Sequence, residues 1–95
     1  MLADSGCFSS QSTLAMLRAS LHAAGAYRYR AVHVDTQAVY TNNGFCGAFR
    51  GFGVNQSNFA MESMMDELCA KGGFDRWQFR YDNALDTGRM TTTGH

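Results

Sequence analysis

The residues best suited to holding a ligand form one short segment, Gly47-Ala48-Phe49-Arg50-Gly51-Phe52-Gly53. Its three glycines lack the Cβ atom that would keep a ligand away from the backbone. A helical pattern follows directly, and the unpaired N–H groups at a helix N-terminus attract polar or anionic groups. This combination predicts that the segment binds an anionic or polar cofactor.

The residues of this segment are also compatible with two other interpretations. It could be a tight connector whose Phe49 and Phe52 pack in the core, because glycine and aromatic residues often serve turns and packing. Arg50-Gly51-Phe52-Gly53 also matches the first half of an RNA-recognition strand signature. The second half fails, since Val54 and Ser57 stand where aromatic residues are needed, and the net charge is zero. Nucleic acid is therefore not an expected partner.

Before this segment, a helix followed by a long strand is expected. Leu14, Leu17 and Leu21 recur at helical spacing after Ser12, which is expected to cap the helix. Gly25 is expected to end it. A strand is then expected over residues 27–40, which are rich in β-branched and aromatic side chains. A second, weaker strand could lie within residues 2–9.

Two helices are expected after the glycine-rich segment. The first carries an apolar face of about four turns and is stopped by Gly72 and Gly73. Asp75 and Gln78 resemble a capping box that opens the second helix. The expected fold class is α+β, in the order helix, long strand, glycine-rich loop and two helices, over residues 1–95 with no internal domain boundary.

One clear strand cannot satisfy its own backbone N–H and C=O groups, so the chain is expected to be a fragment of a larger domain. The charged share of 17% is below the roughly 25% typical of soluble domains, which suggests that part of the surface is normally covered. The three cysteines show neither a disulfide nor a zinc-ligand spacing. With no apolar stretch of roughly 20 residues, no membrane is an expected partner, and a cytoplasmic location is expected.

Several blocks, in the same order along the chain, resemble one known family. They comprise Ala3–Gly6, Leu17–Tyr27, Ala38–Asn42, Cys46–Gly53, Gln56, Met61–Glu62, Met65–Leu68 and Trp77–Leu85. Together they resemble the molybdopterin-binding, catalytic subunit of the xanthine dehydrogenase and aldehyde oxidase family of molybdenum hydroxylases. The resemblance covers essentially the whole chain and implies an internal fragment of that subunit, a partial molybdopterin-binding domain.

The resemblance implies roles for particular residues. Ala48, Phe49, Arg50 and Gly51 match the segment beside the molybdenum-molybdopterin cofactor, and Arg50 matches a position that lies near the metal through its backbone N–H. Phe52 matches the aromatic residue that packs on the ring of a substrate. Arg18 matches the arginine that purine-oxidising members direct at the substrate, where its guanidinium can stabilise developing negative charge.

The implied reaction is the oxidative hydroxylation of a purine or related N-heterocycle. It needs a general-base glutamate, and no residue of this chain matches that glutamate, so no catalytic residue is assigned and the chain alone is expected to be inactive. The resemblance implies as partners the rest of the subunit, with iron–sulfur and FAD groups in other domains or subunits. The alternatives are an aldehyde-oxidising member of the family and a non-catalytic binding or assembly module derived from it.

Overall fold

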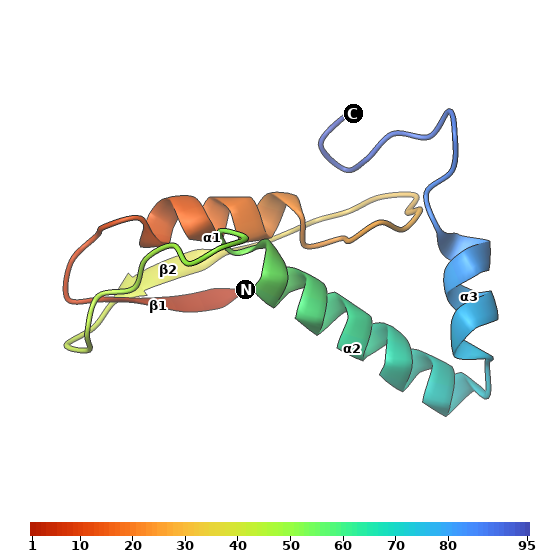
Figure 1. Ribbon diagram of the computed structural model, residues 1–95, viewed down its shortest axis with the longest axis horizontal. Coiled ribbons are helices and arrows are strands. Elements are labelled where there is room, and N and C mark those ends of the chain that lie inside the picture. Colours follow the sequence, from red (N-terminus) through yellow and green to blue (C-terminus); the bar gives the residue numbers. More distant parts are fainter.

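The structure is a computed structural model that describes all of residues 1–95 (Figure 1). The elements in chain order are β1 (Leu2–Gly6), α1 (Ser12–Leu21), β2 (Gln37–Tyr40), α2 (Val54–Gly72) and α3 (Arg76–Asn83). This confirms the α+β class and the two helices after the glycine-rich loop. None of the helices is long and apolar enough to cross a membrane.

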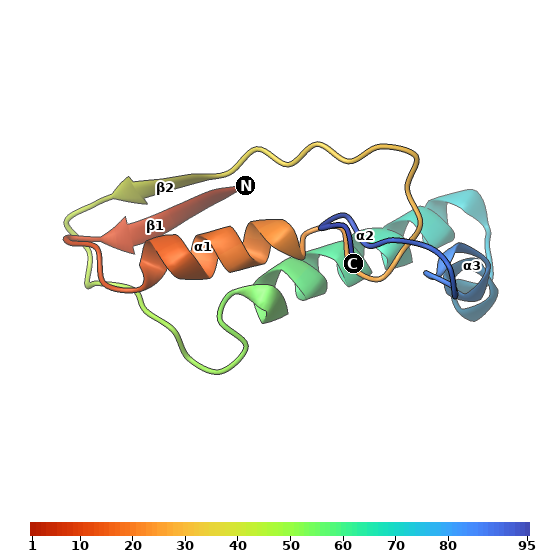
Figure 2. The same cartoon turned by 90° about the horizontal axis from the view of Figure 1, so that it is seen from above.

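The two strands form a small parallel sheet, which contains the second strand sought within residues 2–9. Leu2 pairs with Gln37 at one end and Gly6 with Tyr40 at the other, with an irregularity between Asp4 and Gly6. Helix α1 makes the crossover between the strands and lies along one side of the sheet (Figure 2). The start of α2 lies beside α1, and the glycine-rich segment runs along the outside of α1 to reach it (Figure 2).

The long strand expected over residues 27–40 is wrong, because only its last four residues, Gln37–Tyr40, are a strand. Tyr27 instead forms an isolated antiparallel bridge with Ala84. Val32 and Val34 are exposed and pair with no strand. β-Branched side chains favour a strand because they pack well against the side chains of a neighbouring strand. These 95 residues supply no neighbouring strand for residues 27–36, so that part of the segment is not a strand.

The helix ends agree only partly with the sequence. Ser12 is the first residue of α1 and not its cap; the cap is Gln11, which makes no side-chain capping hydrogen bond. Helix α1 ends at Leu21, before Gly25. Asp75 caps α3 as expected by accepting from the backbone N–H of Gln78 at 2.7 Å. Helix α2 ends at Gly72 as expected, followed by a left-handed Gly73.

Few residues are buried, and most of them lie where α1, α2 and the segment after α1 meet: Ala19, Ala24, Tyr27, Met65 and Cys69. Many large apolar side chains remain exposed, including Leu2, Phe49 and Trp77. This observation fits the expectation that part of the surface is covered in a larger protein.

A hydrogen-bonded network joins α2 to α3. Arg80 donates through Nε to Glu62 at 2.7 Å and through Nη2 to Asp66 at 2.9 Å, and the Tyr27 hydroxyl donates to Glu62 at 2.7 Å. Glu62 and Asp66 lie one turn apart on the face of α2 that meets α3. The hydrogen bond from Tyr27 holds the pKa of Glu62 below its usual value. The network is structural and fixes the far end of α2.

Candidate cofactor-binding site

The glycine-rich segment Gly47–Gly53, here called the donor loop, is anchored at both ends. Before it, the N–H of Cys46 donates to the carbonyl of Ser5 in β1 at 3.3 Å, and the rings of Phe45 and Phe8 stack with centroids 5.1 Å apart. At its other end, Gly53 packs directly against the carbonyl of Ala15 in α1. The loop therefore spans from β1 to α1.

The backbone N–H groups of the donor loop are free. None of the N–H groups from Gly47 to Gly53 donates a hydrogen bond within these 95 residues. Helix α2 begins directly afterwards, with no side-chain cap and no acidic residue in its first turn. Free amide donors next to a helix N-terminus attract an anionic or polar group. The donor loop thus fits the cofactor chemistry predicted from its sequence.

The backbone of the donor loop is held in an unusual conformation. Arg50 has a φ angle of 34° and Phe52 one of 53°, both in the left-handed region that non-glycine residues seldom adopt. The side chain of Asn55 donates through Nδ2 to the carbonyl of Arg50 at 3.0 Å and holds this part of the loop to α2. Backbone strain of this kind, retained by surrounding contacts, is often found at binding sites.

The sequence-predicted cofactor residues, Ala48, Phe49, Arg50 and Gly51, are adjacent in this loop and all exposed. Phe49 is the most exposed large apolar side chain, at 92%. Phe52 is partly buried at the end of the loop, next to the contact between Gly53 and α1. The structure therefore presents the backbone of this segment, as well as its aromatic side chains, to an incoming group.

Arg18 lies on the exposed face of α1. It is exposed together with Leu14 and Leu21, which share its face at spacings of i–4 and i+3. Gly53 contacts Ala15, which lies one turn before Arg18. The structure thus brings the Phe52 end of the donor loop to the same part of α1 as Arg18, but shows no contact between the two predicted substrate residues.

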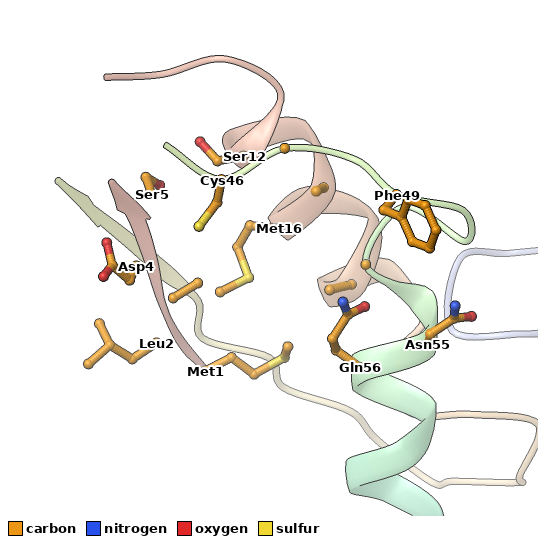
Figure 3. A pocket seen from close by; sticks show the side chains of 15 residues that line it. Met1, Leu2, Asp4, Ser5, Ser12, Met16, Cys46, Phe49, Asn55 and Gln56 are labelled. Carbon is orange, nitrogen blue, oxygen red and sulfur yellow. The ribbon is translucent and has the colours of Figure 1, made fainter. Parts of the chain in front are cut away.

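A cavity of about 480 Å³ lies between β1, α1 and the donor loop (Figure 3). Of the residues given a site role by the resemblance, only Phe49 lines it, together with Gly47 and Gly53 of the donor loop. Its one charged side chain is Asp4, which accepts hydrogen bonds from Thr41 Oγ1 at 2.6 Å and from the N–H of Gly6 at 2.8 Å. Hydrogen bonds from Thr41, then Asn43 and then the N–H of Gly6 hold the pKa of Asp4 below its usual value.

Sequence reasoning missed two residues near the loop. Asn55 could have been suspected, because an amide side chain in the first turn of a helix can reach back to the preceding loop. Ser12 lines the cavity with its hydroxyl buried and without a hydrogen-bond partner. Nothing in the local sequence distinguishes such a serine from a helix cap.

The comparisons with known proteins agree with this geometry. Residues 1–84 match the model of the molybdopterin cofactor-binding domain family. This chain belongs to that family. The resemblance drawn from the sequence blocks is therefore confirmed, and the cofactor of the family is molybdenum-molybdopterin.

Relatives of this molybdopterin cofactor-binding chain are oxidoreductases. It is 39% identical to the nicotinate dehydrogenase large molybdopterin subunit of Eubacterium barkeri, over 99% of this chain and 22% of the relative. It is 37% identical to a probable subunit of a xanthine dehydrogenase from Bacillus subtilis, over 87% of this chain and 11% of the relative.

The fold of this molybdopterin cofactor-binding segment is also found in a solved enzyme. The aldehyde oxidoreductase from Desulfovibrio gigas superposes with a TM-score of 0.89 at 35% identity, over 99% of this chain and 11% of that structure. The chain thus spans between about a tenth and about a fifth of the proteins it matches. It is a segment of a molybdopterin-binding subunit of the molybdenum hydroxylases.

Proposed function

We propose that these residues form one side of the molybdenum-cofactor site of an oxidoreductase that hydroxylates purines or related N-heterocycles. The observation that carries the proposal is the exposed face of α1 beside the donor loop, where Arg18 stands among Leu14 and Leu21. Leucine side chains suit a flat ring, and the guanidinium offers several donors to the polar edge of a heterocycle. The relative named for nicotinate, which is an N-heterocycle, supports this substrate class.

In this proposal the donor loop holds the cofactor through its backbone. The free N–H groups of Ala48, Phe49, Arg50 and Gly51 would donate to it, and Arg50 is the residue that the resemblance assigns to the side of the metal. The bound cofactor supplies the two-electron oxidation that hydroxylation of a carbon requires. Phe52 packs on the substrate ring, and Arg18 stabilises negative charge that develops on the substrate. The protein's contribution is thus orientation and charge stabilisation.

The carboxylates described above do not suit the role of general base. Glu62 and Asp66 are bound to Arg80, and Glu67 lies 3.7 Å from Lys71 on the exposed face of α2. Asp4 accepts several hydrogen bonds and its pKa is lowered, which makes it a weak base. We therefore propose that the base comes from the rest of the subunit and that these 95 residues alone are inactive.

The remaining parts of the proposal concern partners and location. Iron–sulfur and flavin groups would accept the electrons in other domains or subunits, and the enzyme would be cytoplasmic. An aldehyde substrate is the second candidate, because an aldehyde oxidoreductase shares the fold at a TM-score of 0.89. A non-catalytic binding or assembly module is the third candidate. An adjoining reading frame that encodes the general-base glutamate of the family would argue against this candidate.

The deciding experiment uses the full-length subunit with its partner subunits. Its kcat/KM is measured on xanthine, hypoxanthine, nicotinate and aromatic aldehydes, and its molybdenum content is measured in parallel. A preference for the heterocycles supports the proposal, and a preference for aldehydes overturns its substrate class. Turnover of hypoxanthine or xanthine by the 95 residues alone, reconstituted with cofactor, would contradict the proposed inactivity.

A further inference from the structure

One edge of strand β1 has no partner. The N–H of Gln37 donates to the carbonyl of Met1 at 2.9 Å, so the backbone of Met1 faces β2. In a parallel ladder the residues of a strand alternate between its two neighbours. The N–H and C=O groups of Leu2 and Asp4 therefore point to the outer edge, away from β2, where no other strand lies.

The cavity follows this open edge. All five residues from Met1 to Ser5 line the cavity. Because successive residues of a strand point to opposite faces of the sheet, a cavity that touches all five lies along the edge of the strand. Figure 3 shows β2 on one side of β1 and the cavity, followed by α1, on the other. The opposite wall is the face of α1 that carries Ser12 and Met16. The space is thus a groove parallel to an unpaired strand.

The groove also contains a buried group that needs a partner. The hydroxyl of Ser12 lies in a residue that is only 8% exposed and makes no hydrogen bond. A buried hydroxyl is unfavourable unless it is hydrogen-bonded. The groove therefore borders an unpaired hydroxyl of α1 as well as the open edge of β1.

The lining of the groove offers no cationic side chain to an anionic occupant. Its one charged side chain, the Asp4 carboxylate, already accepts hydrogen bonds from Thr41, Asn43 and the N–H of Gly6. Methionine, leucine and alanine residues, together with Cys46 and Phe49, make up eight of the 15 lining residues, which suits apolar side chains. A neutral, extended polypeptide fits such a groove, because its backbone pairs with the edge and its side chains alternate between the two sides.

We propose that an extended segment of the same subunit, outside these 95 residues, pairs with the outer edge of β1 as a third strand. The polypeptide for it exists, since the chain spans only 22% of the nicotinate dehydrogenase subunit to which it is similar. A two-stranded sheet is marginally stable alone, so a third strand would also hold β1 in place. Because Cys46 is bonded to β1, this strand would fix the first anchor of the donor loop.

A proline substitution in the full-length subunit tests the proposal. Leu2→Pro removes only the N–H that points to the outer edge, and Leu2→Ala is the matched control for loss of the side chain. Loss of one hydrogen bond of the added strand should lower the Tm of Leu2→Pro by about 1 °C more than that of Leu2→Ala. Proline is tolerated on a free edge, so equal Tm values would overturn the proposal.

A crosslinking experiment identifies the occupant even where Leu2→Pro does not fold. Leu2 is replaced by p-benzoylphenylalanine in the full-length subunit, which is irradiated and mapped by mass spectrometry. A link to a segment of the same polypeptide outside residues 1–95 is expected. A link to a second copy, to the cofactor or only to residues within 1–95 would overturn the proposal, as would the absence of any link.

Discussion

Gly53 lies so close to Ala15 that a Cβ atom at position 53 would stand 2.1 Å from the Ala15 carbonyl oxygen. The contact joins the end of the donor loop to α1, and Gly53 also has a φ angle of 94°. Only glycine accommodates both the approach and this angle at low cost. We predict that Gly53→Ala destabilises the subunit by about 2 kcal/mol or more and lowers its molybdenum content.

Gly73→Ala is the matched control for this prediction. Gly73 has a φ angle of 70°, but a Cβ atom there would meet nothing within 4 Å. It should therefore show the cost of the backbone angle alone, about 1 kcal/mol, with the molybdenum content unchanged. Thermal unfolding and metal analysis of both variants check this. Equal losses in the two variants would show that the approach to Ala15 has no effect of its own.

The sequence predicts the helices well because their apolar spacing and their end signals are local. Gly72 and Gly73 end α2, and Asp75 caps α3, in both prediction and structure. The long strand over residues 27–40 is wrong because strand formation depends on a neighbour, which local composition does not reveal. Ser12 has the composition of a cap, yet tertiary packing buries it inside the first turn.

The donor loop can be found from its glycines, since close backbone approach is the main reason for three of them in seven residues. Its anchors cannot be found in that way. The contacts of Gly53 with Ala15 and of Cys46 with Ser5 join residues about 40 positions apart in sequence. The roles of Arg18 and Phe52 rest on family resemblance. The structure shows where these two residues lie, and it does not show what they bind.

Asn55 is predicted to hold the donor loop in its binding conformation. Asn55→Ala removes the hydrogen bond to the Arg50 carbonyl and should cost about 1 kcal/mol. The freed loop should be cleaved faster by trypsin after the exposed Arg50, and the molybdenum content should fall. Asn58→Ala is the control, because Asn58 is exposed on the same helix and makes no side-chain hydrogen bond. Similar cleavage rates in the two variants would contradict this role.

Tyr27→Phe is predicted to destabilise the subunit only within a limited pH range. It removes the hydrogen bond to Glu62, which should cost about 1–2 kcal/mol near neutral pH. The folded-state pKa of Glu62 is lowered, so its contribution is present above the ordinary value of 4.5 and is lost as the pH falls through the lowered pKa. Burial, followed by the Glu62 hydrogen bond, raises the pKa of Tyr27. The stability that the protonated Tyr27 hydroxyl contributes is therefore present below pH 10.0 and is lost as the pH rises through the raised pKa.

Denaturant unfolding from about pH 3 to about pH 11 checks this prediction, where the wild type and Tyr27→Phe should differ most between the ordinary pKa values of 4.5 and 10.0. Tyr81→Phe is the control, because the Tyr81 hydroxyl is exposed and makes no hydrogen bond. A stability difference between wild type and Tyr27→Phe that stays constant over the whole range would contradict the role of the Tyr27–Glu62 pair.

Arg18→Met is predicted to lower kcat/KM for purine substrates about a hundredfold, because it removes a cation that would stabilise charge developing on the ring. Aldehyde oxidation should fall far less, since an aldehyde offers no heterocyclic ring nitrogen to the Arg18 guanidinium. Arg18→Lys should rescue purine oxidation only partly, because an ammonium lacks the planar fork of donors. Arg30→Met is the control, as Arg30 is also exposed and makes no ion pair. Parallel steady-state kinetics on both substrate classes check this, and equal losses on purines and aldehydes would mean that Arg18 acts on the fold and not on the substrate.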